Sequence, residues 1–151
     1  MNVYALLIGI ITAILIIWHF KRRKLEKAQL PYPLLLASFS VYYFVFALYA
    51  SDFAALYKEI GISLLFMLIV FLAIKSNKKI SSSIVALGCI AHGIYDIYHN
   101  TLFINNGVPE WWAEFCGSID LILGVYLIFF VITAPNKAFK LERQKNGDHL
   151  T

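Results

Sequence analysis

The side chains best suited to chemistry in this chain are histidine, aspartate and cysteine residues at helical spacing. His92, Asp96 and His99 are spaced i, i+4 and i+7, so they form one stripe on a helix face. Cys116 and Asp120 form a second pair at i and i+4. Imidazole and carboxylate groups can bind cations, take up protons or act as general acid and base. The spacing therefore predicts a polar site within helices.

The two sets lie on consecutive apolar segments, about residues 80–101 and 111–133, which are joined by a short loop. Two helices joined in this way run antiparallel and usually pack together. Counting about 1.5 Å per residue, Asp120 lies at the depth of His92 to Asp96. We therefore expect the two sets to meet inside the membrane.

The meeting point is predicted to be an outward-facing polar pocket that binds a small ligand, an ion or a proton. An ionised Asp near mid-membrane costs at least about 2.5–3.5 kcal/mol on insertion scales, so two of them need partners. The ligand-binding candidates, from the floor of the pocket to its mouth, are His92, Asp96, His99, Asp120, Glu114 and Trp112. The candidates for catalysis are His92, Asp96 and Asp120.

A divalent metal ion is the cofactor that these residue types could hold. The candidate ligands are His92, Asp96, His99 and Asp120. Cα atoms at i and i+7 are about 10.5 Å apart, so a single ion bound by the whole stripe is awkward. Two sets are easier geometrically: His92, Asp96 and Asp120, or Asp96, His99 and Glu114.

Other interpretations of the same residues stay open. The chain could be a membrane-embedded hydrolase or lipid-modifying enzyme, with or without a metal. It could equally be a non-catalytic assembly protein, in which a His–Asp hydrogen bond only holds two helices together. Transport by one copy is disfavoured, because no charged residue continues the path beyond His92 and Asp120 within their segments. A pore would require a homo-oligomer.

The two cysteines, Cys89 and Cys116, both fall inside predicted spans and form no C-x-x-C motif. Buried cysteines of this kind usually act as small hydrophobic residues. Metal ligation and a disulfide are the alternatives.

The elements that position these residues follow from the charge pattern. All 13 Lys and Arg residues except Lys58 fall in three clusters, at 21–27, 75–79 and 137–145, and these clusters alternate with long apolar runs. Short loops rich in Lys and Arg stay cytoplasmic. The pattern predicts five transmembrane helices with the N-terminus outside and the C-terminus in the cytoplasm. Glu59 is expected at the outer interface, next to Lys58.

The predicted fold class is an all-α integral membrane bundle, because 60% of the 151 residues are hydrophobic and mean hydropathy is +0.72. The transmembrane domain covers residues 1–135, and a charged cytoplasmic tail follows at 136–151. The expected spans are about 3–20, 33–50, 54–74, 80–101 and 111–133. The lipid bilayer is thus the main partner. A nucleic-acid partner is not expected, since the positive charges flank apolar spans.

One stretch resembles a group of known sequences. It reads Ala91-His92-Gly93-x-Tyr95-Asp96-x-x-His99, then Val108-Pro109-x-Trp111-Trp112, then Cys116 and Asp120. It is similar to small bacterial polytopic membrane proteins of unknown function, over about residues 91–126. The resemblance implies a helical protein of the bacterial inner membrane with its polar residues in the last two spans. It implies no activity, substrate or cofactor.

Overall fold

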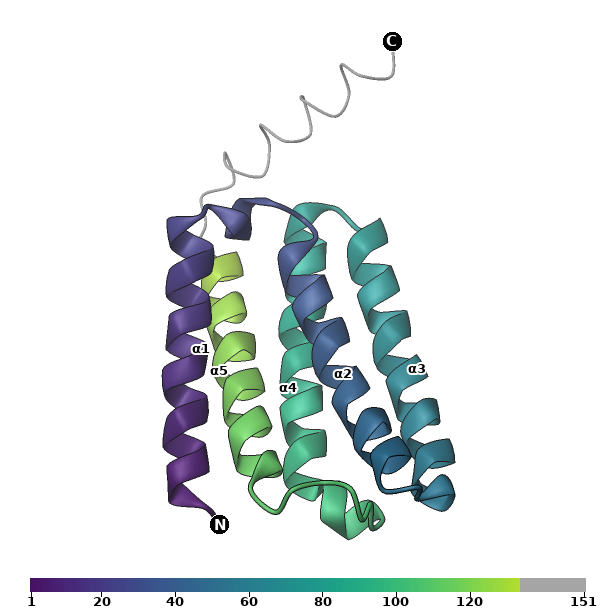
Figure 1. Cartoon of the computed structure of the whole chain (residues 1–151). Coiled ribbons are helices and arrows are strands. Elements are labelled where there is room, and N and C mark those ends of the chain that lie inside the picture. Colours follow the sequence, from purple (N-terminus) through teal and green to yellow (C-terminus); the bar gives the residue numbers. More distant parts are fainter. Residues whose placement is uncertain (134–151) are drawn as a thin grey trace.

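The computed structural model describes residues 1–133, which form a bundle of long helices without strands in this part of the chain (Figure 1). The helices are α1 (Val3–Arg22), α2 (Pro31–Tyr49), α3 (Phe53–Lys75), α4 (Lys78–Leu102) and α5 (Trp112–Thr133), with a 3-10 turn η1 (Leu25–Lys27) after α1. All five long helices are apolar enough to cross a membrane, which confirms the predicted all-α bundle of five spans. The predicted tail, 136–151, lies outside the described residues.

Polar side chains fix where three of these helices begin. Asn2, Asp52 and Asn77 each occupy the N-cap position, and each accepts a hydrogen bond of 3.1 Å from the backbone N–H three residues ahead. Pro31 opens α2, where its missing N–H has no intrahelical partner to lose. Every boundary lies within two residues of its predicted position.

The bundle has two distinct ends (Figure 1). One end holds η1 and the α3–α4 connection, and we call it the basic end because Lys21–Lys27 and Lys75–Lys79 lie there. The other end holds the start of α1, the α2–α3 turn and the α4–α5 loop. α4 is the central helix: it packs against α2, α3 and α5, whereas α1 packs mainly on α5.

The central helix is polar inside and apolar outside. His92, Asp96 and His99 are each 1% exposed, while Leu87 and Ile94 of the same helix are 64% and 48% exposed. In water this pattern would be inverted. Lipid is as apolar as these outward-facing side chains, so the pattern is suited to a helix in a bilayer.

Glycines bring α4 and α5 close together at the level of the polar residues. A Cβ atom on Gly93 would lie 3.1 Å from the Gly117 carbonyl oxygen, and one on Gly117 would lie 3.3 Å from the Asp96 Cβ. Two turns further along, a Cβ on Gly124 would lie 2.9 Å from the Ala86 carbonyl oxygen. Small residues at a membrane helix interface allow this close approach, so the polar side chains of the two helices can touch directly.

Candidate functional site

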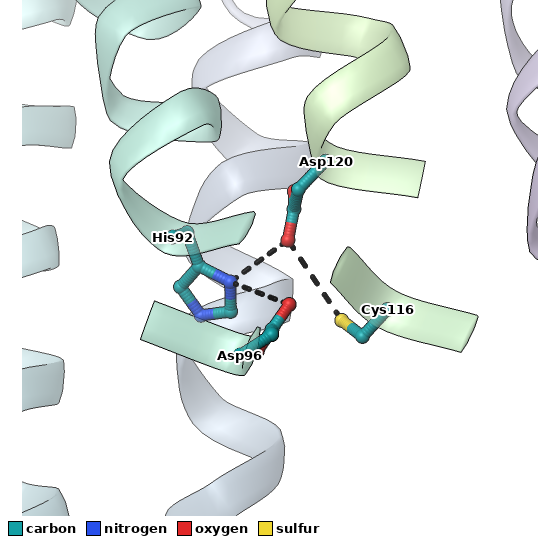
Figure 2. Close-up of side chains that lie close together, drawn as sticks. All are labelled: His92, Asp96, Cys116 and Asp120. Atoms are coloured by element: carbon teal, nitrogen blue, oxygen red, sulfur yellow. Dashed lines mark hydrogen bonds and ion pairs between the residues drawn. The ribbon is translucent and has the colours of Figure 1, made fainter. Parts of the chain in front are cut away.

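The buried polar residues of α4 and α5 converge on one point (Figure 2). His92 Nδ1 lies 2.8 Å from Asp120 Oδ2 and 3.5 Å from Asp96 Oδ2. The Cys116 thiol contributes a weak hydrogen bond, with Sγ 3.8 Å from Asp120 Oδ2. We call these four residues, His92, Asp96, Cys116 and Asp120, the four-residue cluster. The antiparallel register predicted for the two spans is the one that brings them together.

Solvent does not reach this cluster from the protein surface. His92 and Asp96 are 1% exposed, Cys116 is 2% exposed and Asp120 is fully buried. Aromatic rings enclose the imidazole of His92, and their centroids lie 4.7–6.5 Å from it; they belong to Phe39, Tyr43, Phe66 and Tyr95. The polar atoms therefore sit in a low-dielectric environment, where an unpaired charge is costly.

The carboxylates of the cluster are only partly hydrogen-bonded. Neither oxygen of Asp96, nor Oδ1 of Asp120, accepts a hydrogen bond from any residue within 1–133. The nearest positive group is His92, whose Nδ1 is closer to Asp120 than to Asp96. With His92 protonated and both carboxylates ionised, the cluster would carry one uncompensated negative charge. This arrangement is suited to attracting a cation.

A second polar network lies nearer the end opposite the basic one, and Glu59 of α3 is its centre. Glu59 Oε1 accepts hydrogen bonds from His99 Nε2 and Asn105 Nδ2, both at 2.8 Å, and Oε2 accepts one from the Tyr95 hydroxyl at 2.7 Å. Asn105 also donates to the backbone carbonyl of Tyr43 at 3.1 Å. Glu59 is 1% exposed, so its side chain is enclosed by the bundle. The network ties α2, α3, α4 and the α4–α5 loop together.

The other predicted site residues lie apart from the cluster. His99 belongs to the Glu59 network, and its ring stacks on Tyr43 with centroids 4.3 Å apart. Glu114 faces α1, where its Oε1 accepts a hydrogen bond of 3.0 Å from the backbone N–H of Asn2. The side chains of Asp96, His99 and Glu114 are therefore not brought together, whereas those of His92, Asp96 and Asp120 are.

Trp112 lies one turn before the cluster along α5. Its position i−4 to Cys116 places it on the same face of α5, one turn closer to the end opposite the basic one. The indole is 8% exposed and packs on Tyr42 and Phe46 of α2, at centroid distances of 5.1 and 4.8 Å.

Comparison with family models, curated proteins and solved structures finds no match for this chain. Its function must be inferred from its own residues.

The four-residue cluster has the composition of a metal site. One ligand atom from each residue, an imidazole nitrogen, a thiol sulfur and two carboxylate oxygens, lies within 4.8 Å of the others. The sequence indicated three of these residues, but it favoured a hydrophobic role for Cys116. The signal for including it was its i, i+4 spacing from Asp120, which places both side chains on one face. Neither Cys116 nor Cys89 is in a disulfide.

Proposed function

We propose that this chain is a multi-pass membrane protein that binds a cation, either a metal ion or a proton, between α4 and α5. The observation that carries the proposal is the Asp96 carboxylate, which is 1% exposed and accepts no hydrogen bond from residues 1–133. An ionised carboxylate at this depth costs at least about 2.5–3.5 kcal/mol, and a second one, Asp120, lies beside it. A bound cation would compensate the negative charge that His92 leaves unbalanced.

A structural lock between helices accounts for the cluster less well. In such a lock each carboxylate oxygen would be hydrogen-bonded, as the oxygens of Glu59 are. The hydrolase alternative requires water and substrate to reach the reacting groups, and the four side chains are at most 2% exposed. A small cation can bind where carboxylate oxygens lack hydrogen-bond partners, and it does not require a wide entrance.

The orientation and the membrane belong to the same proposal. The basic end would face the cytoplasm, because Lys and Arg in short loops are retained there, and the start of α1 would face outside. The resemblance of residues 91–126 to small bacterial membrane proteins supports a bacterial inner membrane. The four-residue cluster would then be reached from the outer side, past Trp112.

The test is the effect of cations on thermal unfolding of the protein in lipid nanodiscs. Wild type and Asp96→Asn would be unfolded in chelator, then with Zn²⁺, Mg²⁺ or Na⁺, and over about pH 5 to 9. A cation at 100 times its Kd stabilises by about 2.7 kcal/mol, which corresponds to a Tm increase of about 5–11 °C for a chain of this size. We expect at least one cation, or protons, to raise the Tm of wild type but not of Asp96→Asn.

Glu59→Gln is the matched control, because Glu59 is equally buried but fully hydrogen-bonded. It should be less stable than wild type yet keep the response to the cation. The proposal is contradicted if wild type and Asp96→Asn respond identically to every condition in the panel.

A further inference from the structure

We propose that the cation is a divalent transition metal of the zinc class, and that His92, Asp96, Cys116 and Asp120 are its four ligands. This inference rests on the proposed cation-binding function and specifies the ion. Nitrogen, sulfur and oxygen donors are together characteristic of zinc sites, which take four protein ligands in a tetrahedron when the role is structural.

The distances fit a tetrahedral ion. Bonds of about 2.0–2.3 Å to zinc place the ligand atoms of a tetrahedron about 3.3–3.8 Å from one another. The cluster already has Nδ1 of His92 3.5 Å from Asp96 Oδ2, and Sγ of Cys116 3.8 Å from Asp120 Oδ2. The hydrogen-bonded pair of His92 and Asp120, at 2.8 Å, would have to separate by about 0.5 Å when the metal replaces the hydrogen between them. The remaining pairs, all within 4.8 Å, would have to close by at most about 1 Å to reach the tetrahedral range.

The donor set argues against the hard cations. Ca²⁺ takes six to eight oxygen ligands, and Mg²⁺ requires octahedral oxygen coordination and usually keeps several waters. The cluster offers two carboxylates, and its other two donors are an imidazole and a thiol. Thiol and imidazole donors select transition metals over Mg²⁺ and Ca²⁺.

Metal binding forms four bonds and releases protons. The metal forms bonds to Nδ1 of His92, to one oxygen of each aspartate and to Sγ of Cys116. The thiol proton is released to solvent. A protonated His92 also releases its Nδ1 proton to solvent, whereas a neutral His92 keeps its one hydrogen on Nε2, so that Nδ1 binds the metal in either case. At least one proton is therefore released for each metal ion bound, and no oxidant or reductant takes part.

Cys116 also decides between two roles for the metal. With Cys116 bound, the protein fills all four positions, and the ion holds α4 and α5 together. Without it, three protein ligands and a water would form the open arrangement of a catalytic zinc site.

The experiment uses Co²⁺, which replaces zinc and reports its own ligands. Purified protein in detergent would be titrated with Co²⁺, and the near-ultraviolet absorption from thiolate-to-cobalt charge transfer recorded, with Zn²⁺ added last as competitor. We expect this band in wild type with a stoichiometry of one, and its loss when Zn²⁺ displaces Co²⁺. Cys116→Ser should remove the band and weaken Zn²⁺ binding more than about 100-fold, beyond the usual effect of losing an outer-shell partner.

Cys89→Ser is the matched control. Like Cys116, Cys89 is a buried cysteine, but it lies on α4 and is not one of the four ligands. It should keep the full band. Absence of the band in wild type overturns the zinc-class assignment, whether or not Cys116→Ser folds. If protons or Na⁺ then still raise the Tm of wild type but not that of Asp96→Asn, cation binding stands and only the identity of the ion is wrong. If the metal binds without producing the band, Cys116 is not a ligand. That result would overturn the four-ligand site in favour of the open site with three protein ligands and a water.

Discussion

At the scale of single residues, two buried carboxylates of this protein are in opposite situations. Glu59 accepts three hydrogen bonds, from His99, Tyr95 and Asn105. Asp96 accepts none from the described part of the chain, although both side chains are 1% exposed. Because a buried charge is stable only when it is paired and hydrogen-bonded, we interpret Glu59 as a structural group and Asp96 as the group that the proposed cation would pair with.

This difference predicts the effect of Glu59→Gln on stability. The neutral amide keeps one acceptor oxygen but replaces the other with donors that face the Tyr95 hydroxyl or the His99 and Asn105 side chains. Loss of hydrogen bonds to a buried charged group should lower the free energy of unfolding by about 2–4 kcal/mol. Thermal unfolding in nanodiscs measures this. An unchanged Tm would show that the network does not hold α3 to α4.

Asp52, at the turn between α2 and α3, predicts a pH dependence. Hydrogen bonds from the backbone N–H groups of Ala55 and Asn106 hold the pKa of this carboxyl below its ordinary value of 3.8. The unfolded state then takes up the proton at a higher pH than the folded state does. The stability that the Asp52 charge contributes is therefore complete well above pH 3.8 and is lost as the pH falls through the folded-state pKa.

Comparison of wild type with Asp52→Asn between about pH 3 and pH 6 tests this, since asparagine keeps a side-chain oxygen for the helix cap. Wild type should be the more stable at pH 6, and the difference should shrink toward pH 3. A difference that grows in acid would mean that the carboxylate is not stabilised by these contacts.

At the scale of helices, α1 approaches α5 most closely at Gly9 among the glycines of the two helices. A Cβ atom on Gly9 would lie 2.0 Å from Ser118 Oγ and 2.5 Å from the Phe115 carbonyl oxygen, so no larger residue fits without moving the helix. Gly9→Val should therefore lower the free energy of unfolding by about 1–3 kcal/mol. Gly61→Ala is the control, because a Cβ on Gly61 meets no atom within 4 Å. Denaturant titration in micelles should rank the two variants in this order, and equal effects would argue against the α1–α5 contact.

The helices themselves could be predicted from sequence because bilayer thickness sets their length and basic clusters mark their ends. The pairing of α4 with α5 followed from their short loop. The burial of Glu59 inside the bundle was not predicted, because its neighbours Tyr57 and Lys58 are polar and exposed. A signal was present: Ala55, Glu59 and Phe66 lie on one helix face, at i, i+4 and i+11, and all three are buried. Which residue of α4 would meet Glu59 depends on helix tilt, which the sequence does not encode locally.

At the scale of the whole molecule, the buried polar side chains lie inside the bundle and its outer surface is largely apolar. The three basic clusters of the sequence predict that the basic end faces the cytoplasm. A reporter protein that folds only in the cytoplasm, fused after Thr151, should be active in cells. A reporter active only outside should be inactive at the same position. The opposite pair of results would invert the proposed orientation and place the entrance to the cluster on the cytoplasmic side.

The central claim is that the four-residue cluster is a cation site and not a lock between helices. The most direct test is the Tm of Asp96→Asn relative to wild type, in chelator without added salt, at about pH 8. A cation site without its ion contains an unpaired buried charge, so removing that charge should raise the Tm by several degrees. A lock would lose a stabilising contact, and a Tm lower than that of wild type would contradict the claim.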